Sequence, residues 1–482
     1  MYKAYVTYVT NIRPAANADR LNACEVFGNT TIIDKTITED TLVLYLPSDG
    51  QISVEFGENN NLFRRKDDAG NNVGGFIDPD KRNITAIRLR GNRSDGLVLP
   101  ISCLNYCFGH GDASIELRVG DVIDGLVNGH EICCKYIPRS NTRRGTVTEG
   151  NRTRKKKVPT APLFAEHADT EQLAYNLGAF KPGDEIEITL KMHGTSQRTG
   201  YLPVLQGYKR TLWDRITRKE GTPIYDYGYV SGTRRVVLEN YEGGFYGNNE
   251  VREQHSKAFE GKLWKGETVY YEVVGFTTSG APIMASASNS KLQDKEFIKQ
   301  YGKETVFSYG CSPIPNATIL DTKDGNFAEY TPVGSQSDIY VYRMTMTNPD
   351  GEVVEYTPDF MRYRCEQMAV KTVPVFWHGF IPEFDDRIYV DRNDNGECDD
   401  SETVYVRPID AGEWVRAKAE EYYDGVDPIG KTHVREGVVV RIINKPKFCA
   451  YKHKNWSFRV LEGIVKVDAE APDMEEAQEV FE

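Results

Sequence analysis

The stretch at residues 185–196 reads EIEITLKMHGTS, and it begins with the alternation of polar and apolar residues that is typical of a β-strand. This pattern leads directly into Lys191, which is followed by His193 and Gly194. A lysine is rarely buried unless an acid pairs with it or it takes part in a reaction. The remaining sequence has to show which of the two applies to Lys191.

The composition is that of an ordinary folded protein. The chain has 482 residues, of which 39% are hydrophobic and 27% are charged, so we expect two or three domains with packed cores. No apolar run approaches the roughly 18 residues that a membrane-spanning helix needs. The first residues, MYKAYVTYVTNIRP, do not have the layout of a signal peptide. We therefore expect a soluble protein of the cytoplasm.

The nine cysteines show no repeating spacing, and their number is odd. This usage indicates free thiols in a reducing compartment. The closest approach to a metal-binding pattern is the set Cys103, Cys107, Cys133 and Cys134, but its spacing differs from that of a zinc ribbon. Zinc binding is therefore the minor alternative for these residues.

Charge is distributed unevenly along the chain. The net charge of −12 argues against a protein that coats nucleic acid without selection. Residues 139–157 nevertheless contain eight basic residues and one acid, and we assign 139–160 to a basic linker that can meet phosphates locally. The final residues, 467–482, are strongly acidic, and we expect them to form a disordered tail.

The first domain is predicted to be all-β and to span residues 1–138. Short strand-like runs such as YKAYVTYV and TLVLYLP are separated by turn residues at close intervals. Residues 17–21, NADRL, resemble a turn between the first strands of OB-fold tRNA-binding modules. This resemblance implies a small β-barrel that binds nucleic acid through basic and aromatic side chains. A barrel that serves only as a spacer is the alternative.

The second domain is predicted to span residues 161–466 and to be α+β with antiparallel sheets. Helices are expected within 359–370 (DFMRYRCEQMAV) and 412–425 (GEWVRAKAEEYYDG), with Pro358 in the first turn of the former. A further short helix is expected within 164–180. Strands outnumber helices and no regular βαβ alternation appears, which argues against a Rossmann fold.

Four further stretches place charged residues within apolar strand patterns. They are SGTRRVVL at 231–238, VYYEVVGF at 269–276, REGVVVRI at 435–442 and AYKHKNWSFRVLEG at 450–463. A single case would indicate a structural ion pair. Five such stretches, two with acids and three with bases, indicate a site for a polyanionic ligand together with a metal ion.

In this order the five stretches resemble the motifs of the covalent nucleotidyltransferase superfamily of ligases and capping enzymes, whose Lys-x-x-Gly lysine attacks the α-phosphate of a nucleotide. The resemblance is closest to ATP-dependent nick-sealing RNA ligases of the Naegleria type, for which we expect Lys-x-His-Gly-Thr-Ser at the lysine motif. It covers nearly the whole chain. It implies an amino-terminal OB-fold barrel followed by an antiparallel-sheet, ATP-grasp-like nucleotidyltransferase domain.

The resemblance implies that Lys191 forms a covalent lysyl–AMP, with Lys452 and Lys454 contacting the α-phosphate. Only the neutral amine can attack, whereas the ordinary pKa of lysine is about 10.4. A metal ion and two neighbouring cations would lower the pKa of Lys191 through like-charge repulsion. Lys452 and Lys454 flank His453, so both are expected on one face of a strand. A strand-end lysine that reaches into solvent is the alternative for Lys191.

The resemblance also implies the residues that hold the nucleotide. Glu272 would bind the ribose, Glu436 the Mg²⁺ or Mn²⁺ ion, and Arg198 the ribose or a phosphate. Gly194 would let the backbone approach the nucleotide closely. For His193, contact with ATP and a hydrogen bond within its own loop are equal alternatives, and a structural ion pair is the alternative for each acid.

Two further contacts are expected from the same resemblance. Arg234 or Arg235 would contact nucleic acid or a phosphate group, with a slight preference for Arg234. Tyr342 is expected to stack on adenine, with Tyr340 as the second choice. Ordinary core or surface tyrosines are the alternative for both.

Two segments depart from the pattern of the resemblance. Insertions are expected near residues 281–335 and 380–410. Within the second, residues 391–402 (DRNDNGECDDSE) have the order of ligands found in an EF-hand calcium loop, but the flanking residues indicate strands rather than helices. An acidic hairpin tip is the favoured interpretation, and a calcium site is the alternative.

We therefore predict an ATP-dependent RNA ligase that joins 3′-hydroxyl and 5′-phosphate RNA ends in RNA repair, with ATP as substrate and Mg²⁺ or Mn²⁺ as cofactor. We expect a monomer that acts on nicked duplex or hairpin RNA, and a viral genome is one potential source. A DNA ligase or a capping guanylyltransferase is the nearer alternative, although His193 and the leading OB domain argue against both. A non-catalytic OB-type RNA-binding protein is the more distant alternative, and the five intact charged stretches argue against it.

Overall fold

The computed structural model describes most of the chain. The described residues are 2–18, 20–65, 74–89, 91–109, 112–136, 159–167, 170–217, 221–238, 250–275, 283–284, 289–303, 337–384, 387–389, 396, 403–405, 410–429 and 433–461. They form two compact units, the first built mainly from Met1–Arg139 and the second mainly from Ser140–Asn289 and Lys295–Phe458. The acidic tail, nearly all of the linker and the calcium-like loop except Gly396 lie outside the described residues. The exact domain boundaries stay a prediction.

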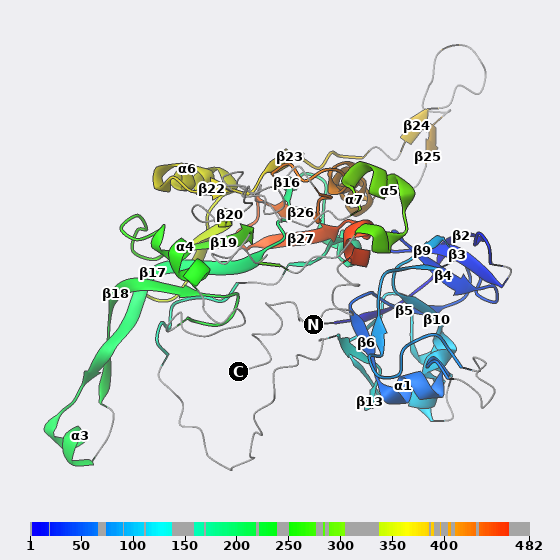
Figure 1. The fold of residues 1–482 in the computed structure, drawn as a ribbon, viewed down its shortest axis with the longest axis horizontal. Helices are drawn as coiled ribbons and strands as arrows, with labels where there is room; N and C mark the ends of the chain where they lie inside the picture. Colours follow the sequence, from blue (N-terminus) through cyan, green and yellow to red (C-terminus); the bar gives the residue numbers. More distant parts are fainter. Residues whose placement is uncertain are drawn as a thin grey trace, which may run out of the picture. The chain divides into compact units, whose positions relative to one another are not determined.

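The first unit is made of short strands with little helix (Figure 1). Its strands are β1 (Ala4–Thr7), β2 (Thr10–Pro14), β3 (Leu21–Val26), β4 (Asn29–Asp34), β5 (Val43–Leu46), β6 (Gly50–Ile52), β7 (Asn83–Ile84), β8 (Ile87–Leu89), β9 (Asn92–Ser94), β10 (Leu97–Pro100), β11 (Val122–Ile123), β12 (Leu126–Val127), β13 (His130–Glu131) and β14 (Cys133–Lys135). Its helices are α1 (Val54–Asn59), α2 (Ala113–Glu116) and the 3₁₀ helix η1 (Ile101–Phe108). The sheets have the orders β10-β5-β1-β11, β14-β6-β7 and β2-β3-β4, with two further pairs, β8–β9 and β12–β13.

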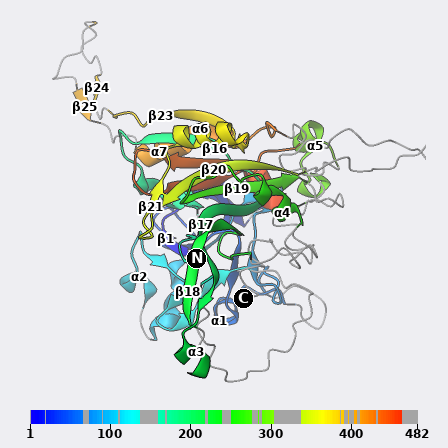
Figure 2. The same cartoon turned by 90° about the vertical axis from the view of Figure 1, so that its left-hand side faces the viewer.

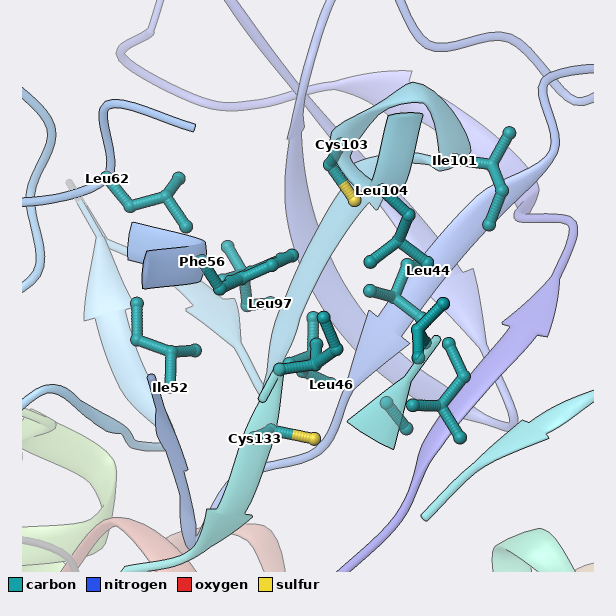
Figure 3. Close-up of a cluster of buried hydrophobic side chains, with 14 of the residues drawn as sticks. Leu44, Leu46, Ile52, Phe56, Leu62, Leu97, Ile101, Cys103, Leu104 and Cys133 are labelled. Atoms are coloured by element: carbon teal, nitrogen blue, oxygen red, sulfur yellow. The ribbon is translucent and has the colours of Figure 1, made fainter. Parts of the chain in front are cut away.

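One apolar core holds the first unit together. Leu44 and Leu46 of β5, Phe56 of α1 and Leu104 of η1 are completely buried in the same cluster, which Figure 3 shows in close-up. Burial raises the pKa of Cys133, another member of this cluster, to about 12, so its thiol packs as an apolar group. The strand-rich first unit agrees with the sequence analysis. The pairing among the described strands does not close into a barrel, however, so the expected OB barrel is not confirmed.

The second unit contains longer strands. They are β15 (Glu171–Gln172), β16 (Glu185–Leu190), β17 (Thr195–Lys209), β18 (Thr222–Gly232), β19 (Glu267–Gly275), β20 (Ser337–Thr347), β21 (Val353–Glu355), β22 (Lys371–Thr372), β23 (Val375–Phe380), β24 (Arg387–Tyr389), β25 (Thr403–Tyr405), β26 (Gly437–Ile442) and β27 (Cys449–Lys454). Its α-helices are α3 (Leu212–Thr217), α4 (Glu250–Lys257), α5 (Lys295–Tyr301), α6 (Pro358–Met368) and α7 (Ala411–Tyr423). The 3₁₀ helices of this unit are η2 (Leu173–Tyr175) and η3 (Leu177–Ala179), whereas η4 (Asn289–Leu292) lies at the division, with residues 290–292 in the first unit.

Two sheets dominate the second unit. The first has the order β15-β27-β26-β16-β23, and the second has the order β18-β17-β19-β20-β21, with β22 also paired to β20. Figure 2 shows β19 and β20 of the second sheet side by side. All pairs are antiparallel except β15–β27 and β20–β22, so the predicted α+β class with mainly antiparallel sheets is confirmed.

Strand β16 is buried on both faces, although its sequence alternates. Ile186 and Ile188 pack against Val415 of α7 on one face. On the other face Glu187 is 3% exposed, and its Oε2 forms an ion pair with Arg362 Nη1 of α6 at 2.7 Å. The alternation therefore reports a polar but buried side rather than a solvent-facing side, because an arginine from another element satisfies the acid.

The two predicted long helices are present, and their first turns explain where they begin. Thr357 caps α6 by accepting a hydrogen bond from the N–H of Phe360, and Pro358 occupies the first turn as predicted. Asp410 caps α7 in the same manner through the N–H of Gly412. The helix predicted within 164–180 is wrong: this stretch forms β15 and the two 3₁₀ turns η2 and η3. None of the described helices is both long and apolar enough to span a membrane.

A buried histidine makes the stability of the second unit depend on pH. His255 of α4 is 8% exposed, its Nε2 lies 2.8 Å from Ser337 Oγ, and burial lowers its pKa to about 4. Below pH 6.5 the histidine is protonated in the unfolded chain but stays neutral in the folded chain. The free energy of unfolding therefore falls by about 1.4 kcal/mol between pH 8 and pH 5.5.

Glutamine does not titrate, so we expect the melting temperature of His255→Gln to fall less between pH 8 and pH 5.5 than that of the unmodified chain. The measurement is thermal unfolding of both proteins across that range, with pH 8 as the reference because position 255 is uncharged there in both. Equal declines in the two proteins would contradict a neutral buried His255.

Candidate functional site

Three strand ends of the five-stranded sheet bring Lys191, Glu436 and Lys454 together. Lys191 directly follows β16, Glu436 directly precedes β26, and Lys454 is the last residue of β27. β26 lies between the other two strands, with Gly437 opposite Lys454. The N–H of Lys191 also donates to the carbonyl of Gly437 at 3.0 Å. The antiparallel register therefore places three charged side chains at the same end of three adjacent strands.

A buried carboxylate lies at the centre of this group. Lys191 Nζ is 2.6 Å from Glu436 Oε1, and Lys454 Nζ is 3.5 Å from the same oxygen. His193 Nδ1 is 2.9 Å from Glu436 Oε2. The Glu436 side chain is 2% exposed and that of Lys191 is 22% exposed, so a ligand in solvent can reach the lysine.

Positive charge exceeds negative charge around this carboxylate. Burial by itself raises the pKa of Glu436, but the charges of Lys191, His193 and Lys454 and the hydrogen bond from His193 together lower it to about 2. Glu436 is therefore ionised at neutral pH. Two lysines and one acid leave a net positive charge, which favours the binding of an anion such as a phosphate group.

Two glycines allow this close approach of strands. Gly437 has φ +148°, and a Cβ atom there would lie 2.1 Å from the carbonyl oxygen of His453 on β27. A Cβ atom at Gly194 would lie 2.3 Å from the carbonyl oxygen of Val273 on β19. The resemblance implies that Gly194 makes room for a nucleotide, whereas the structure provides a nearer reason, the packing of its loop against a neighbouring strand.

The second sheet presents Glu272, Ser196 and Tyr340 side by side. Glu272 of β19 lies opposite Ser196 of β17 and opposite Tyr340 of β20. The Glu272 side chain is half-buried, and Tyr340 is buried at 7% exposure. Tyr340 packs in one apolar cluster with Leu190 and Met192, which flank Lys191 in the chain. The cluster therefore joins the lysine segment to the second sheet.

Tyr342 is turned out of the regular ladder of β20. Consecutive residues of β19 lie opposite Arg343 and Val341, so Tyr342 is the extra residue of a β-bulge. Its ring is half-buried, and its hydroxyl lies 2.9 Å from Ser196 Oγ. A bulge re-aims a side chain, and Tyr342 is more accessible than the buried Tyr340. Stacking of Tyr342 on adenine stays a prediction.

Arg198 is held by the protein itself. It is 1% exposed and donates to the main-chain carbonyls of Thr233 at 2.8 Å, Phe164 at 3.0 Å and Arg235 at 3.2 Å, and also to that of Ala165. Burial lowers the pKa of its guanidinium. This bonding fits a residue that fixes the surrounding segments, and a direct contact of Arg198 with ribose or phosphate stays a prediction.

We expect Arg198→Met to lower the free energy of unfolding by about 3 kcal/mol or more, because it leaves several buried carbonyl groups without their donor. Arg235→Met is the matched control, since Arg235 is exposed, and should change that free energy by no more than about 0.5 kcal/mol. Denaturant titration measures both. An Arg198→Met protein of normal stability that fails to bind nucleotide would instead make Arg198 a ligand contact.

The other predicted basic residues lie in different surroundings. Arg234 is half-buried, and its carbonyl accepts a hydrogen bond from the N–H of His167 at 3.0 Å, whereas Arg235 is exposed. Lys452 is half-buried and lies two residues before Lys454 on β27, opposite Val439. The structure therefore brings Lys191, His193, Glu436 and Lys454 into direct contact, and it keeps Lys452 on the same strand as Lys454.

Two residues of this region were missed by the sequence analysis. Ser196 was part of the opening stretch but was given no role, although its hydroxyl reaches Tyr342. His433 is 3% exposed, and its pKa is lowered by burial and also by the charge of His193. The available signal for His433 was its position in the sequence, three residues before Glu436.

Comparison with known proteins gives similarity only at the level of solved structures. No family model matches the chain, and no curated protein matches it. A lysine-to-methionine mutant of the Naegleria gruberi RNA ligase, solved with AMP and Mn, is similar at 15% identity and a TM-score of 0.49, covering 95% of this chain and 97% of that one. The same ligase with PPi has 15% identity and a TM-score of 0.49, covering 97% and 99% of the two chains. These structures are of the type that the five sequence stretches resemble.

Proposed function

We propose that this protein is an ATP-dependent RNA ligase that joins 3′-hydroxyl and 5′-phosphate RNA ends through a lysyl–AMP and an AMP-capped RNA. One observation carries the proposal. The amine of Lys191 is accessible, and it shares the Oε1 atom of the buried Glu436 with a second lysine, Lys454. A lone structural ion pair would not need the second cation or the histidine on the other carboxylate oxygen.

The arrangement places the amine beside both an acid and a second cation. Lys191 Nζ donates to Glu436 Oε1 at 2.6 Å, and Lys454 Nζ lies 3.5 Å from the same oxygen. A metal ion that arrives with the nucleotide would be held by Glu436. Lys191 would then present its amine as the nucleophile, with Lys454 beside it to contact the phosphate.

The reaction then follows in three transfers. The nitrogen of Lys191 forms a bond to the α-phosphorus of ATP, the bond to pyrophosphate breaks, and the amine loses its proton. A 5′-phosphate oxygen of RNA next takes the adenylate from the lysine, and a 3′-hydroxyl finally attacks the 5′-phosphate and releases AMP. Lys452 and Lys454 are placed to stabilise the negative charge that develops on the phosphate oxygens.

The donor set fits a metal ion that arrives with the nucleotide. Among the described residues no group of three or more His, Cys, Asp or Glu side chains could hold a metal by itself. Glu436 offers one ionised carboxylate, which suits Mg²⁺ or Mn²⁺ because Mg²⁺ is commonly held by one or two carboxylates, waters and substrate phosphates. When bound, such an ion neutralises charge on the phosphates.

The remaining assignments complete the proposal. Tyr342 stacks on adenine and Glu272 binds the ribose, while Arg234 or Arg235 contacts nucleic acid. An OB-type first domain helps to hold nicked duplex or hairpin RNA, and the protein works as a monomer in RNA repair. We place it in the cytoplasm, because the described cysteines are free thiols, as in a reducing compartment.

The test is covalent labelling of the purified protein with α-³²P-ATP or α-³²P-GTP and Mg²⁺ or Mn²⁺, without nucleic acid. Label from ATP alone, followed by sealing of a nicked RNA duplex, supports the proposal. Label from GTP would indicate a capping guanylyltransferase, and sealing of nicked DNA alone a DNA ligase. No label from protein shown to carry no AMP would leave a non-catalytic RNA-binding protein.

A further inference from the structure

A long two-stranded arm projects from the six-stranded sheet of the second unit. β17 pairs with β19 only from Thr195 to Gly200, whereas its pairing with β18 continues to Lys209. Beyond Gly200 no other described strand pairs with β17. Figures 1 and 2 show the two strands leaving the sheet and ending in α3. Residues 159–164 support the ribbon near the sheet, since the N–H of Leu205 donates to the carbonyl of Thr160 at 2.8 Å and Phe164 shares an apolar cluster with Leu202 and Val230.

The tip is a built helix rather than a loose turn. Thr211 Oγ1 accepts from the N–H of Asp214 at 3.2 Å, and Asp214 Oδ2 accepts from the N–H of Thr211 at 2.8 Å. These reciprocal bonds form a capping box at the start of α3. The helix is therefore specified by its own first turn.

This helix displays large apolar side chains to solvent. Leu212 is 78% exposed, Trp213 is 73% exposed and Ile216 is 74% exposed. Soluble proteins expose single apolar residues commonly, but adjacent clusters of this kind mark a surface that binds something. The cluster sits within a basic segment, since residues 209–220 (KRTLWDRITRKE) contain five bases and two acids in a chain of net charge −12.

The arm also carries aromatic rings along one face. Tyr201 lies opposite Tyr229, and two positions further Pro203 lies opposite Tyr227, so these residues share a face of the ribbon. The Tyr201 and Tyr229 rings stack at 4.7 Å, and Lys265 Nζ lies 4.8 Å above the Tyr227 ring. Tyr201 and Tyr229 also pack against the apolar core of the second unit, and the Tyr229 hydroxyl accepts from the N–H of Gly261 at 2.6 Å, so these rings anchor the base of the arm and leave its tip as the exposed surface.

We propose that the tip of this arm, Lys209–Thr217, binds the RNA substrate at a distance from the ends to be joined, with Lys209 and Arg210 on the phosphates and Trp213 against a nucleobase. The inference rests on the proposed function for the choice of RNA. Charge complementarity favours a polyanion, and RNA is the polyanion of the proposed reaction; a two-stranded ribbon is a shape that can follow a strand or enter a groove. β17 connects the tip to the site, because its first residues include Ser196, which contacts Tyr342.

Two variants of the full chain test the tip. The apolar variant is Leu212→Ser/Trp213→Ser/Ile216→Ser, and the charge variant is Lys209→Glu/Arg210→Glu. Fluorescence anisotropy with a labelled nicked RNA duplex measures affinity at several salt concentrations. We expect the apolar variant to bind about tenfold to a hundredfold more weakly, because stacking on one base contributes that much. The charge variant should also reduce the salt slope by about two, one for each lost phosphate contact.

Matched controls separate the tip from general effects. Phe380→Ser removes an apolar side chain that is 63% exposed elsewhere, and Lys181→Glu/Lys295→Glu reverses two exposed charges elsewhere. Both should keep normal affinity. Trp213→Phe keeps a ring that can stack, so its affinity should stay within about threefold of the unmodified chain, whereas Trp213→Ser alone should lose about tenfold.

The outcomes also distinguish failure of this inference from failure of the proposed function. Labelling by ATP without RNA should be unchanged in every arm variant, since the arm does not touch Lys191. Normal labelling with unchanged RNA affinity in both tip variants would overturn the inference and leave the ligase proposal intact. Absent labelling of the unmodified chain would overturn the ligase proposal, while the affinities still decide the role of the tip. Loss of self-association, or of binding to anionic phospholipid vesicles, in place of lost RNA affinity would assign the tip to another partner and overturn the inference.

Discussion

Lys191→Ala is expected to abolish covalent labelling by ATP, with a loss of at least about 1,000-fold, because the substitution removes the atom that forms the bond to AMP. No other described lysine shares the arrangement of Lys191, which combines an accessible amine with the buried Glu436 at 2.6 Å. Lys181→Ala is the matched control: this lysine is exposed and precedes β16 in the same unit, so its removal should leave labelling unchanged.

A second substrate makes the Lys191 prediction specific to one step. An RNA that already carries an AMP cap enters the reaction after the lysine has acted, so Lys191→Ala should still seal it at a measurable rate. Gel analysis of pre-capped nicked RNA tests this. Labelling that persists in Lys191→Ala would move the nucleophile to another residue. Loss of sealing on the pre-capped RNA as well would indicate a general defect rather than the removal of a nucleophile.

Glu436→Gln is expected to reduce labelling by at least about a hundredfold, and to raise the metal concentration needed for half-maximal rate. The amide keeps the volume of the side chain but removes the charge that holds the ion. Two roles of Glu436 make opposite predictions here. If Glu436 only paired with Lys191, its neutralisation would maintain labelling and leave the dependence on metal concentration unchanged.

The measurement for Glu436→Gln is the labelling rate as a function of Mg²⁺ and Mn²⁺ concentration. Glu420→Gln is the control. Glu420 Oε1 of α7 lies 3.5 Å from Nε2 of His453, which precedes Lys454 on β27, but the Glu420 side chain is 40% exposed. This variant should retain nearly normal labelling. A Glu436→Gln protein with undiminished labelling and unchanged metal dependence would refute the metal role.

Stability adds a pH signature for the same acid. The pKa of Glu436 is lowered to about 2 in the folded chain, so its contribution to stability is complete above the ordinary glutamate pKa of about 4.5 and is lost as pH falls towards 2. Glu436→Gln removes this contribution. Its free energy of unfolding should therefore fall less between pH 5 and pH 3 than that of the unmodified chain, which denaturant titration at each pH can measure.

Much of the local structure could be predicted from the sequence because the signals are local. Thr357 and Pro358 specify the start of α6, and Asp410 specifies the start of α7, through contacts with residues two or three positions away. The alternation of residues 185–190 predicts β16 for the same reason. Where the signal was weak, within 164–180, a helix was predicted and two 3₁₀ turns are present.

The local residue pattern predicts charged residues at the ends of buried strands, and therefore that Lys191, Glu436 and Lys454 need partners. The identity of those partners depends on the fold. Lys191 and Glu436 are 245 positions apart in the sequence, and they meet because β26 pairs with β16 on one side and β27 on the other. Strand order and register come from packing across the whole unit, which local periodicity does not encode.

The same limit explains Arg198, Tyr342 and the arm. The sequence marked Arg198 as a candidate ligand contact, but the fold surrounds it with carbonyl groups from distant segments. The bulge that turns Tyr342 outward exists only in the pairing of β20 with β19. The projection of α3 likewise follows from where β19 stops pairing with β17. Local chemistry thus specified the elements and their charges, and long-range pairing decided which of those charges form a site.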